Sequence, residues 1–196
     1  MRIGVYVCHC GLNIAGVVDV AAVREDASAL PDVVIARDNK YTCSEVGQKA
    51  IADDIREYGL DRVVIASCSP RLHERTFREL LTKCGLNPFL LEMANIREQC
   101  SWVHRDDPEA ATAKALDLVG MAVAKVSRAE PLTLFTVPVV PRALVIGGGL
   151  AGMQAALALA EQGFPSYLVE RQDELGGMLR QLHSTLEAGP VAPLLE

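Results

Sequence analysis

The stretch LVIGGGLAGMQAALALAEQGFPSYLVE, residues 144–170, decides the fold of the second part of the chain. It runs from an apolar segment through a glycine turn into an Ala/Leu helix, and then into a second apolar segment that ends at Glu170. This order of strand, turn, helix, strand and acid is typical of a dinucleotide-binding βαβ unit. Gly147 permits the tight turn, Gly149 lets the main chain approach a pyrophosphate, and Gly152 lets helix and strand pack closely.

The start of the helix and the acid supply the binding groups. The main chain of Leu150, Ala151 and Gly152 would direct free N–H groups and the positive end of the helix dipole at the phosphates. Glu170, which is followed by Arg171, ends the second strand, where a carboxylate can accept from ribose hydroxyls. Since an acid there repels a 2′-phosphate, we expect the adenosine half of FAD or NAD.

A second glycine pair favours FAD over NAD. Gly176 and Gly177 follow the acid within the segment ERQDELGGML. This pair resembles the second glycine signature of two-dinucleotide flavoproteins such as thioredoxin reductase, in which FAD occupies the first motif. We therefore place Gly177 with the cofactor-binding residues.

Composition excludes several classes of protein. Half of the 196 residues are apolar, and the net charge is -6. Without a basic tract, nucleic acid is not expected as a partner. The amino terminus does not resemble a signal peptide, and no uninterrupted apolar run is long enough for a membrane helix. We expect a cytoplasmic protein with no transmembrane segment.

The first part of the chain alternates strands with helices. Apolar runs predict strands at residues 2–8, 33–36, 62–67 and 88–92, and helical spacing predicts helices at 20–30, 44–58, 72–84 and 108–128. This alternation indicates an α/β fold with a parallel sheet and flanking helices over residues 1–128. A proline-containing linker at 129–142 would lead to the first βαβ of a Rossmann-type FAD-binding domain at 143–196.

Cysteines follow the predicted strands. All six cysteines, Cys8, Cys10, Cys43, Cys68, Cys84 and Cys100, lie in the first part of the chain. Because the carboxyl ends of parallel strands meet at one edge of a sheet, five of them should gather there, and only Cys84 should not. Soft thiolates in a reducing compartment suit an iron–sulfur cluster or structural zinc, although buried free cysteines are the plainer alternative.

The chain resembles the amino-terminal part of the A-type subunits of heterodisulfide reductase. The resemblance rests on VCHCGLNIAGVVDV at 7–20, YTCSEVGQ at 41–48, VVIASCSPRLHERTFRE at 63–79 and GLNPFLLEMANIREQCSWVH at 85–104, together with the glycine segment. It implies part of an oxidoreductase complex from an anaerobe, in which a cysteine-rich domain precedes a thioredoxin-reductase-like FAD domain. The implied activity is electron transfer, including flavin-based electron bifurcation.

The same resemblance implies cofactors and partners. The cysteines at the edge of the sheet would hold one 4Fe–4S cluster, and FAD would bind an incomplete site in this chain. The implied partners are heterodisulfide reductase subunits of the B and C types, hydrogenase or ferredoxin-type electron donors and acceptors, and a second copy of the full-length protein. The chain ends after one βαβ and lacks a CxxCxxCxxxCP run, so we expect a fragment without catalytic residues, inactive alone.

We expect Cys10, Cys43, Cys68 and Cys100 to ligate the cluster, with Cys8 as the alternative ligand. Cys8 and Cys10 point the same way in an extended segment, so both could reach one metal centre. The alternative function is a metal-free or zinc-stabilised domain that docks and assembles partner subunits.

Overall fold

The computed structural model describes residues 1–184 and Val191, so the end of the predicted 143–196 segment lies outside the described residues. The chain divides into two compact units, Met1–Leu134 and Phe135–Glu196. The division falls within residues 129–142, which contain no helix or strand. Among the described residues, no helix combines the length and apolar character that crossing a bilayer requires.

A four-stranded parallel sheet forms the centre of the first unit. Its order is β2-β1-β3-β4, and its strands are β1 (Ile3–Cys8), β2 (Val33–Asn39), β3 (Arg62–Ser67) and β4 (Leu91–Asn95). The central strands β1 and β3 are buried along almost their whole length, as expected for a sheet with both faces covered. The predicted fold class, an α/β domain with a parallel sheet and flanking helices, is confirmed.

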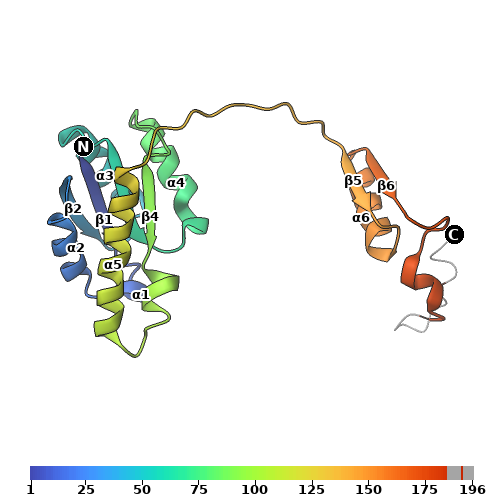
Figure 1. Cartoon of the computed structure of the whole chain (residues 1–196), viewed down its shortest axis with the longest axis horizontal. Helices are drawn as coiled ribbons and strands as arrows, with labels where there is room; N and C mark the ends of the chain where they lie inside the picture. The colour runs from blue at the N-terminus through green and yellow to red at the C-terminus, as the bar shows by residue number, and fades with distance from the viewer. Residues whose placement is uncertain (185–190, 192–196) are drawn as a thin grey trace. The chain divides into compact units, whose positions relative to one another are not determined.

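Helices cover both faces of this sheet (Figure 1). Alternate residues of β1 point to opposite faces: Val5 packs into the cluster beneath α2 and α5, while Tyr6 packs into the cluster beneath α3 and α4. The helices are α2 (Val20–Ser28), α3 (Glu45–Glu57), α4 (Pro70–Lys83) and α5 (Pro108–Ser127). Two short elements, α1 (Leu12–Ala15) and the π-helix η1 (Arg97–Ser101), follow β1 and β4.

The sequence predicts three of the strands well but misplaces β4. We expected this strand at residues 88–92, whereas it begins at Leu91 and ends at Asn95. The cause is a turn at Asn87, whose side-chain oxygen accepts from Phe89 N at 3.0 Å and whose carbonyl accepts from Leu90 N at 3.1 Å. The turn uses the apolar Pro88 and Phe89, so that strand pairing begins three residues later than their character suggests.

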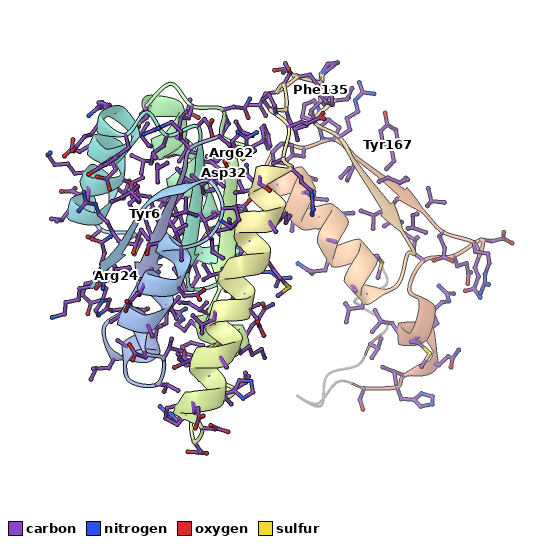
Figure 2. The ribbon with its side chains drawn as sticks, turned by 60° about the vertical axis from the view of Figure 1, so that its left-hand side comes forward. Tyr6, Arg24, Asp32, Arg62, Phe135 and Tyr167 are labelled. Atoms are coloured by element: carbon purple, nitrogen blue, oxygen red, sulfur yellow. The ribbon has the colours of Figure 1, made fainter. Side chains whose placement is uncertain are left out.

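The second unit begins with a single βαβ. Its strands β5 (Ala143–Ile146) and β6 (Ser166–Val169) pair in parallel, α6 (Leu150–Glu161) connects them, and the 3-10 helix η2 (Gly177–Gln181) follows. The Rossmann-type start predicted from the glycine turn is therefore present. No residue of α6 is buried, and β5 and β6 leave alternate apolar side chains exposed, among them Ile146 and Tyr167 (Figure 2).

A buried carboxylate joins β1, β2 and α3. Asp54 is only 3 % exposed and accepts from Tyr6 Oη at 3.1 Å, Arg37 Nε at 2.7 Å and Arg37 Nη2 at 2.9 Å. Figure 2 labels Tyr6 on β1, inside the first unit. Burial, followed by the Asp54 charge, raises the pKa of Tyr6 well above its usual range, so the phenol remains a donor.

We predict that Asp54→Ala lowers the free energy of unfolding by about 3 kcal/mol, because it leaves a partly buried guanidinium and a buried phenol without their acceptor. Urea titration followed by circular dichroism measures the change. The matched control is Asp53→Ala, since Asp53 is a neighbouring surface carboxylate that pairs only with Lys49 and Arg56. Equal losses in the two variants would show that the Asp54 network is not a stabilising element.

Candidate functional site

The carboxyl ends of the four strands form one edge of the sheet, here called the thiol edge. In register, Cys8 at the end of β1 pairs with Asn39 at the end of β2. Val7 pairs with Ala66, so Ser67 and Cys68 lie one and two residues further along β3. Chain segments far apart in sequence therefore place cysteines beside one another.

Cys8 joins the first two cysteine-containing loops. Its buried sulfur accepts from Cys10 N at 3.3 Å and from Thr42 N at 3.4 Å. Thr42 is followed directly by Cys43, and Ser44 then caps α3. Main-chain N–H groups directed at a cysteine sulfur stabilise negative charge on that sulfur, as in iron–sulfur proteins.

Cys10 adopts an uncommon backbone conformation. Its φ of 48° lies in the left-handed region, and Gly11 follows at φ 60°. Two successive left-handed residues turn the chain sharply after β1. Such strain in a non-glycine residue is frequent at functional sites. The Cys10 sulfur, half-buried, accepts from Arg97 Nη1 at 3.1 Å.

Cys43 and Cys68 lie within electrostatic reach of the same loop. Burial raises the pKa of Cys43, and the nearby Cys8 and Cys10 thiols raise it further. Burial also raises the pKa of Cys68, while Arg97 acts to lower it and Cys10 to raise it. Both thiols therefore favour the protonated form in the metal-free protein, and a bound metal would displace their protons.

Cys100 is placed differently from the other four. It lies in η1, is fully buried and donates from its sulfur to the Ala111 carbonyl at 2.9 Å. Burial raises its pKa, and the only charge that acts on it is Lys114, which lowers it. Its role as a ligand stays a prediction, but its commitment to α5 makes Cys8 the better-placed fourth thiol. Cys84 caps the far end of α4, as its spacing predicts.

Unpartnered polar atoms also gather at the thiol edge. In the part of the chain that the structure describes, four buried side-chain atoms have no hydrogen-bond partner: Asn39 Nδ2, Thr42 Oγ1, Ser67 Oγ and Arg97 Nε. All four belong to the ends of β2, β3 and β4 or to the residues that follow them. Because such atoms are costly to bury unpaired, their concentration here indicates a missing acceptor.

This chemistry suits an iron–sulfur group, although the side chains do not yet form a coordination sphere. Within residues 1–184 and Val191, no three Cys, His, Asp or Glu side chains are arranged as a finished metal site. The donor set nevertheless fits: Cys8, Cys10, Cys43 and Cys68 would supply thiolates, and the unpartnered N–H and O–H groups would donate to sulfur.

The glycine turn of the second unit has the geometry that its sequence predicts. Gly147 has a φ of 106°, which side chains rarely adopt. A Cβ on Gly152 would lie 1.8 Å from Gly147 O, so only glycine lets α6 begin this close to β5. A Cβ on Gly149 would meet nothing within 4 Å, because it would project into open space beside the turn. That space belongs to a pocket of about 450 Å³ bordered by Gly149, Leu150 and residues of η2.

Glu170 holds the turn in place. Its Oε2 accepts from Gly148 N at 2.6 Å, and its Oε1 accepts from Arg171 N at 2.7 Å and Gln172 N at 2.9 Å. These main-chain donors, that of Gln172 first, hold the pKa of Glu170 below its usual value. The carboxylate is therefore ionised and fixed at the end of β6, where we expect the ribose hydroxyls.

The second glycine pair closes against the first turn. Gly176 N donates to Gly148 O at 2.7 Å, and Gly177 lies so close that its Cβ would be 3.3 Å from Gly149 Cα. Gly177 also has a φ of 49°. Two glycine segments that the sequence separates by more than twenty residues thus shape one pocket.

Sequence reasoning missed the polar residues that surround the cysteines. Arg97 and Glu98 belong to a π-helix that no spacing pattern predicts, and Asn39 and Thr42 carry no motif of their own. A usable signal was present: a charged pair directly after an apolar strand, at the edge where ligands collect.

Comparison with known proteins agrees with this architecture. Residues 143–187 match the family model of FAD dependent oxidoreductases, so the second unit is the start of an FAD-dependent oxidoreductase domain.

Three similar relatives extend over both units, and each is the A-type subunit of its complex. The chain is 61 % identical over 184 residues to the second iron-sulfur subunit of this type in the CoB–CoM heterodisulfide reductase of Methanopyrus kandleri, covering 94 % of this chain and 28 % of the relative. It is 60 % identical, with the same coverage, to that of the H(2):CoB-CoM heterodisulfide,ferredoxin reductase of Methanothermobacter thermautotrophicus. It is 58 % identical to that of the ferredoxin:CoB-CoM heterodisulfide reductase of Methanosarcina mazei, covering 91 % of this chain and 23 % of that relative.

The chain belongs to the family of A-type subunits of heterodisulfide reductase, which confirms the resemblance seen in its motifs. It spans about a quarter of the length of the relatives it matches.

We predict that two glycine substitutions in the turn fail for different reasons. Gly152→Ala should lower the melting temperature of the second unit, since the new methyl group overlaps Gly147 O. Gly149→Ala should leave that temperature nearly unchanged and still reduce flavin content in the full-length protein, because its methyl group enters the space expected for the pyrophosphate. Thermal unfolding and flavin absorbance distinguish the two. Full flavin content in Gly149→Ala would show that the pyrophosphate lies elsewhere.

Proposed function

We propose that the first unit holds one 4Fe–4S cluster through Cys8, Cys10, Cys43 and Cys68, and that it exchanges single electrons with FAD in a heterodisulfide reductase. The observation that carries this proposal is the coincidence of four thiols with four unpartnered buried polar atoms at one edge of a parallel sheet. A metal-free domain would have no reason to leave its only such atoms, among the described residues, beside its cysteines.

The protein's part in this function is to position and insulate the group. When bound, an iron–sulfur cluster accepts and releases one electron at a time. The loops after β1, β2 and β3 would supply its thiolates, and the N–H groups of Cys10 and Thr42 would donate to Cys8 sulfur. Rigid strands on both sides limit reorganisation when the charge changes.

The flavin segment completes the proposal. Gly147, Gly149 and Gly152 would shape the pyrophosphate site, the main chain of Leu150 and Ala151 would donate to it, and Glu170 would accept from the ribose. FAD would exchange electron pairs for single electrons, and this exchange is the step on which bifurcation depends. No residue here is assigned to hydride chemistry, because the described pocket is shaped only by the turn and η2.

The names of the relatives supply the wider setting. We propose that the full-length protein works in the cytoplasm as a homodimer, with heterodisulfide reductase subunits of the B and C types and with hydrogenase or ferredoxin-type electron partners. Relatives are named as subunits of CoB-CoM heterodisulfide reductases, some with ferredoxin as a second partner.

A metal-free or zinc-stabilised docking domain is the second candidate. It is favoured by the lack of a finished metal site among the described residues and by the half-exposed Trp102 and exposed Val103 near the thiol edge. Iron and zinc analysis of anaerobically purified protein separates the two candidates. Iron with acid-labile sulfide supports the cluster, zinc supports the second candidate, and neither metal leaves only docking.

We predict that Cys8→Ser, Cys10→Ser, Cys43→Ser and Cys68→Ser each lose most of the iron of the first unit, since serine is a poor ligand for this group. Cys100→Ser should keep it, because a hydroxyl can still donate to the Ala111 carbonyl. Cys84→Ser is the matched control. Iron content and EPR of the dithionite-reduced 196-residue chain measure the outcome. Iron loss in Cys100→Ser with retention in Cys8→Ser would restore Cys100 as the fourth ligand.

We predict that Glu170→Ala reduces FAD content in the full-length protein, because it removes both the ribose acceptor and the anchor of Gly148 N. Glu170→Gln should retain part of the binding, since its amide oxygen can still accept from one of these donors. Glu161→Ala, at the exposed end of α6, is the control. Wild-type flavin content in Glu170→Ala would contradict the assigned role.

A further inference from the structure

Arg97 is the cation at the thiol edge, and it is held in an unusual way. It opens the π-helix η1 directly after β4, and π-helical turns are frequent at functional sites. Its side chain is only 14 % exposed and stacks on Trp102, with Cζ 4.7 Å from the ring centroid. Stacking on an aromatic face holds a guanidinium in place without satisfying its N–H groups.

The three nitrogens of this guanidinium have three different fates. Nη2 donates to Glu98 Oε1 at 2.7 Å, Nη1 donates to Cys10 Sγ at 3.1 Å, and Nε has no partner among the described residues. A guanidinium with a purely structural role would direct its forked donors at carboxylates or carbonyls. Arg97 instead contacts a thiol that we assign as a ligand, and it keeps one buried donor free.

Glu98 ties this arrangement to a second cysteine loop. Its Oε2 accepts from Ser69 N at 2.8 Å, and Ser69 directly follows Cys68. Burial acts to raise the pKa of Glu98, but the hydrogen bond from Arg97 and main-chain donors hold it below its usual value. Burial likewise acts against the charge of Arg97, yet Glu98 and Cys10 keep its pKa raised. Both groups therefore stay ionised.

We infer that Arg97 is a positioning residue that sets the reduction potential of the group at the thiol edge, by donating to Cys10 sulfur and offering Nε to the inorganic core, while Glu98 fixes its orientation. This inference rests on the proposed function. Reduction adds one electron, supplied by reduced flavin, and neither forms nor breaks a bond to the protein. The net charge becomes one unit more negative, which a buried cation with N–H donors stabilises.

The test is a potentiometric EPR titration of the full-length protein and its Arg97→Gln variant, with iron and acid-labile sulfide measured on each sample. At a fixed potential, we expect the ratio of reduced to oxidised group to fall about tenfold in Arg97→Gln, which is a midpoint about 59 mV more negative for a one-electron couple. Arg97→Lys keeps the charge but loses the fork, so its midpoint should lie between the two.

Arg78 provides the matched control. It also stacks on an aromatic ring, that of Phe89 at 4.9 Å, and pairs with a glutamate, Glu74 at 2.5 Å, but its partners belong to α4 and to the turn before β4. Arg78→Gln should therefore leave the midpoint unchanged.

The outcomes separate this inference from the proposed function. Wild-type protein without iron would overturn the proposed function itself. Wild-type and Arg97→Gln proteins with equal iron and equal midpoints would overturn the role of Arg97 and leave the cluster intact. If Arg97→Gln does not retain iron, Arg97→Lys decides: a midpoint below that of the wild type supports the role, and an unchanged midpoint overturns it.

Discussion

The parallel pairing of β1 with β3 is the constraint on which the site in the first unit depends. Because both strands run the same way and are buried on both faces, the residues after Cys8 and after Ser67 must leave the sheet at one edge. A register change of one residue would turn the side chain of Cys8 to the other face of the sheet. The apolar contacts that fix this register therefore also fix the distance between the thiols.

Both units use the same device for different chemistry. In each, a strand delivers the chain to a loop with a left-handed residue, at Cys10 in the first unit and at Gly147 in the second. A carboxylate from outside the loop then holds a main-chain N–H: Glu98 holds that of Ser69, and Glu170 holds that of Gly148. A soft metal group and a pyrophosphate can thus be bound by loops that are rigid before the ligand arrives.

Periodicity predicted what depends on local sequence. The strands around Val5 and Val64, the cap of α3 and the glycine turn follow from apolar spacing and from residue-specific conformational limits. Patterns could not place β4, because a side-chain turn at Asn87 competes with strand formation. They also could not show that Cys100 turns into the core, since its direction is set by the π-helix and by a carbonyl of α5. The role of Arg97 arises only from contacts across the fold.

The position of iron in the folded protein tests the assignment of the thiol edge most directly. Anomalous diffraction at the iron absorption edge, from anaerobically grown crystals of the full-length protein, locates that position without reference to activity. We expect a single iron-rich peak in the first unit, within bonding distance of the sulfurs of Cys8, Cys10, Cys43 and Cys68 and beside Arg97. A first unit without an iron peak, or with one bonded to Cys84 or Cys100, would contradict this assignment.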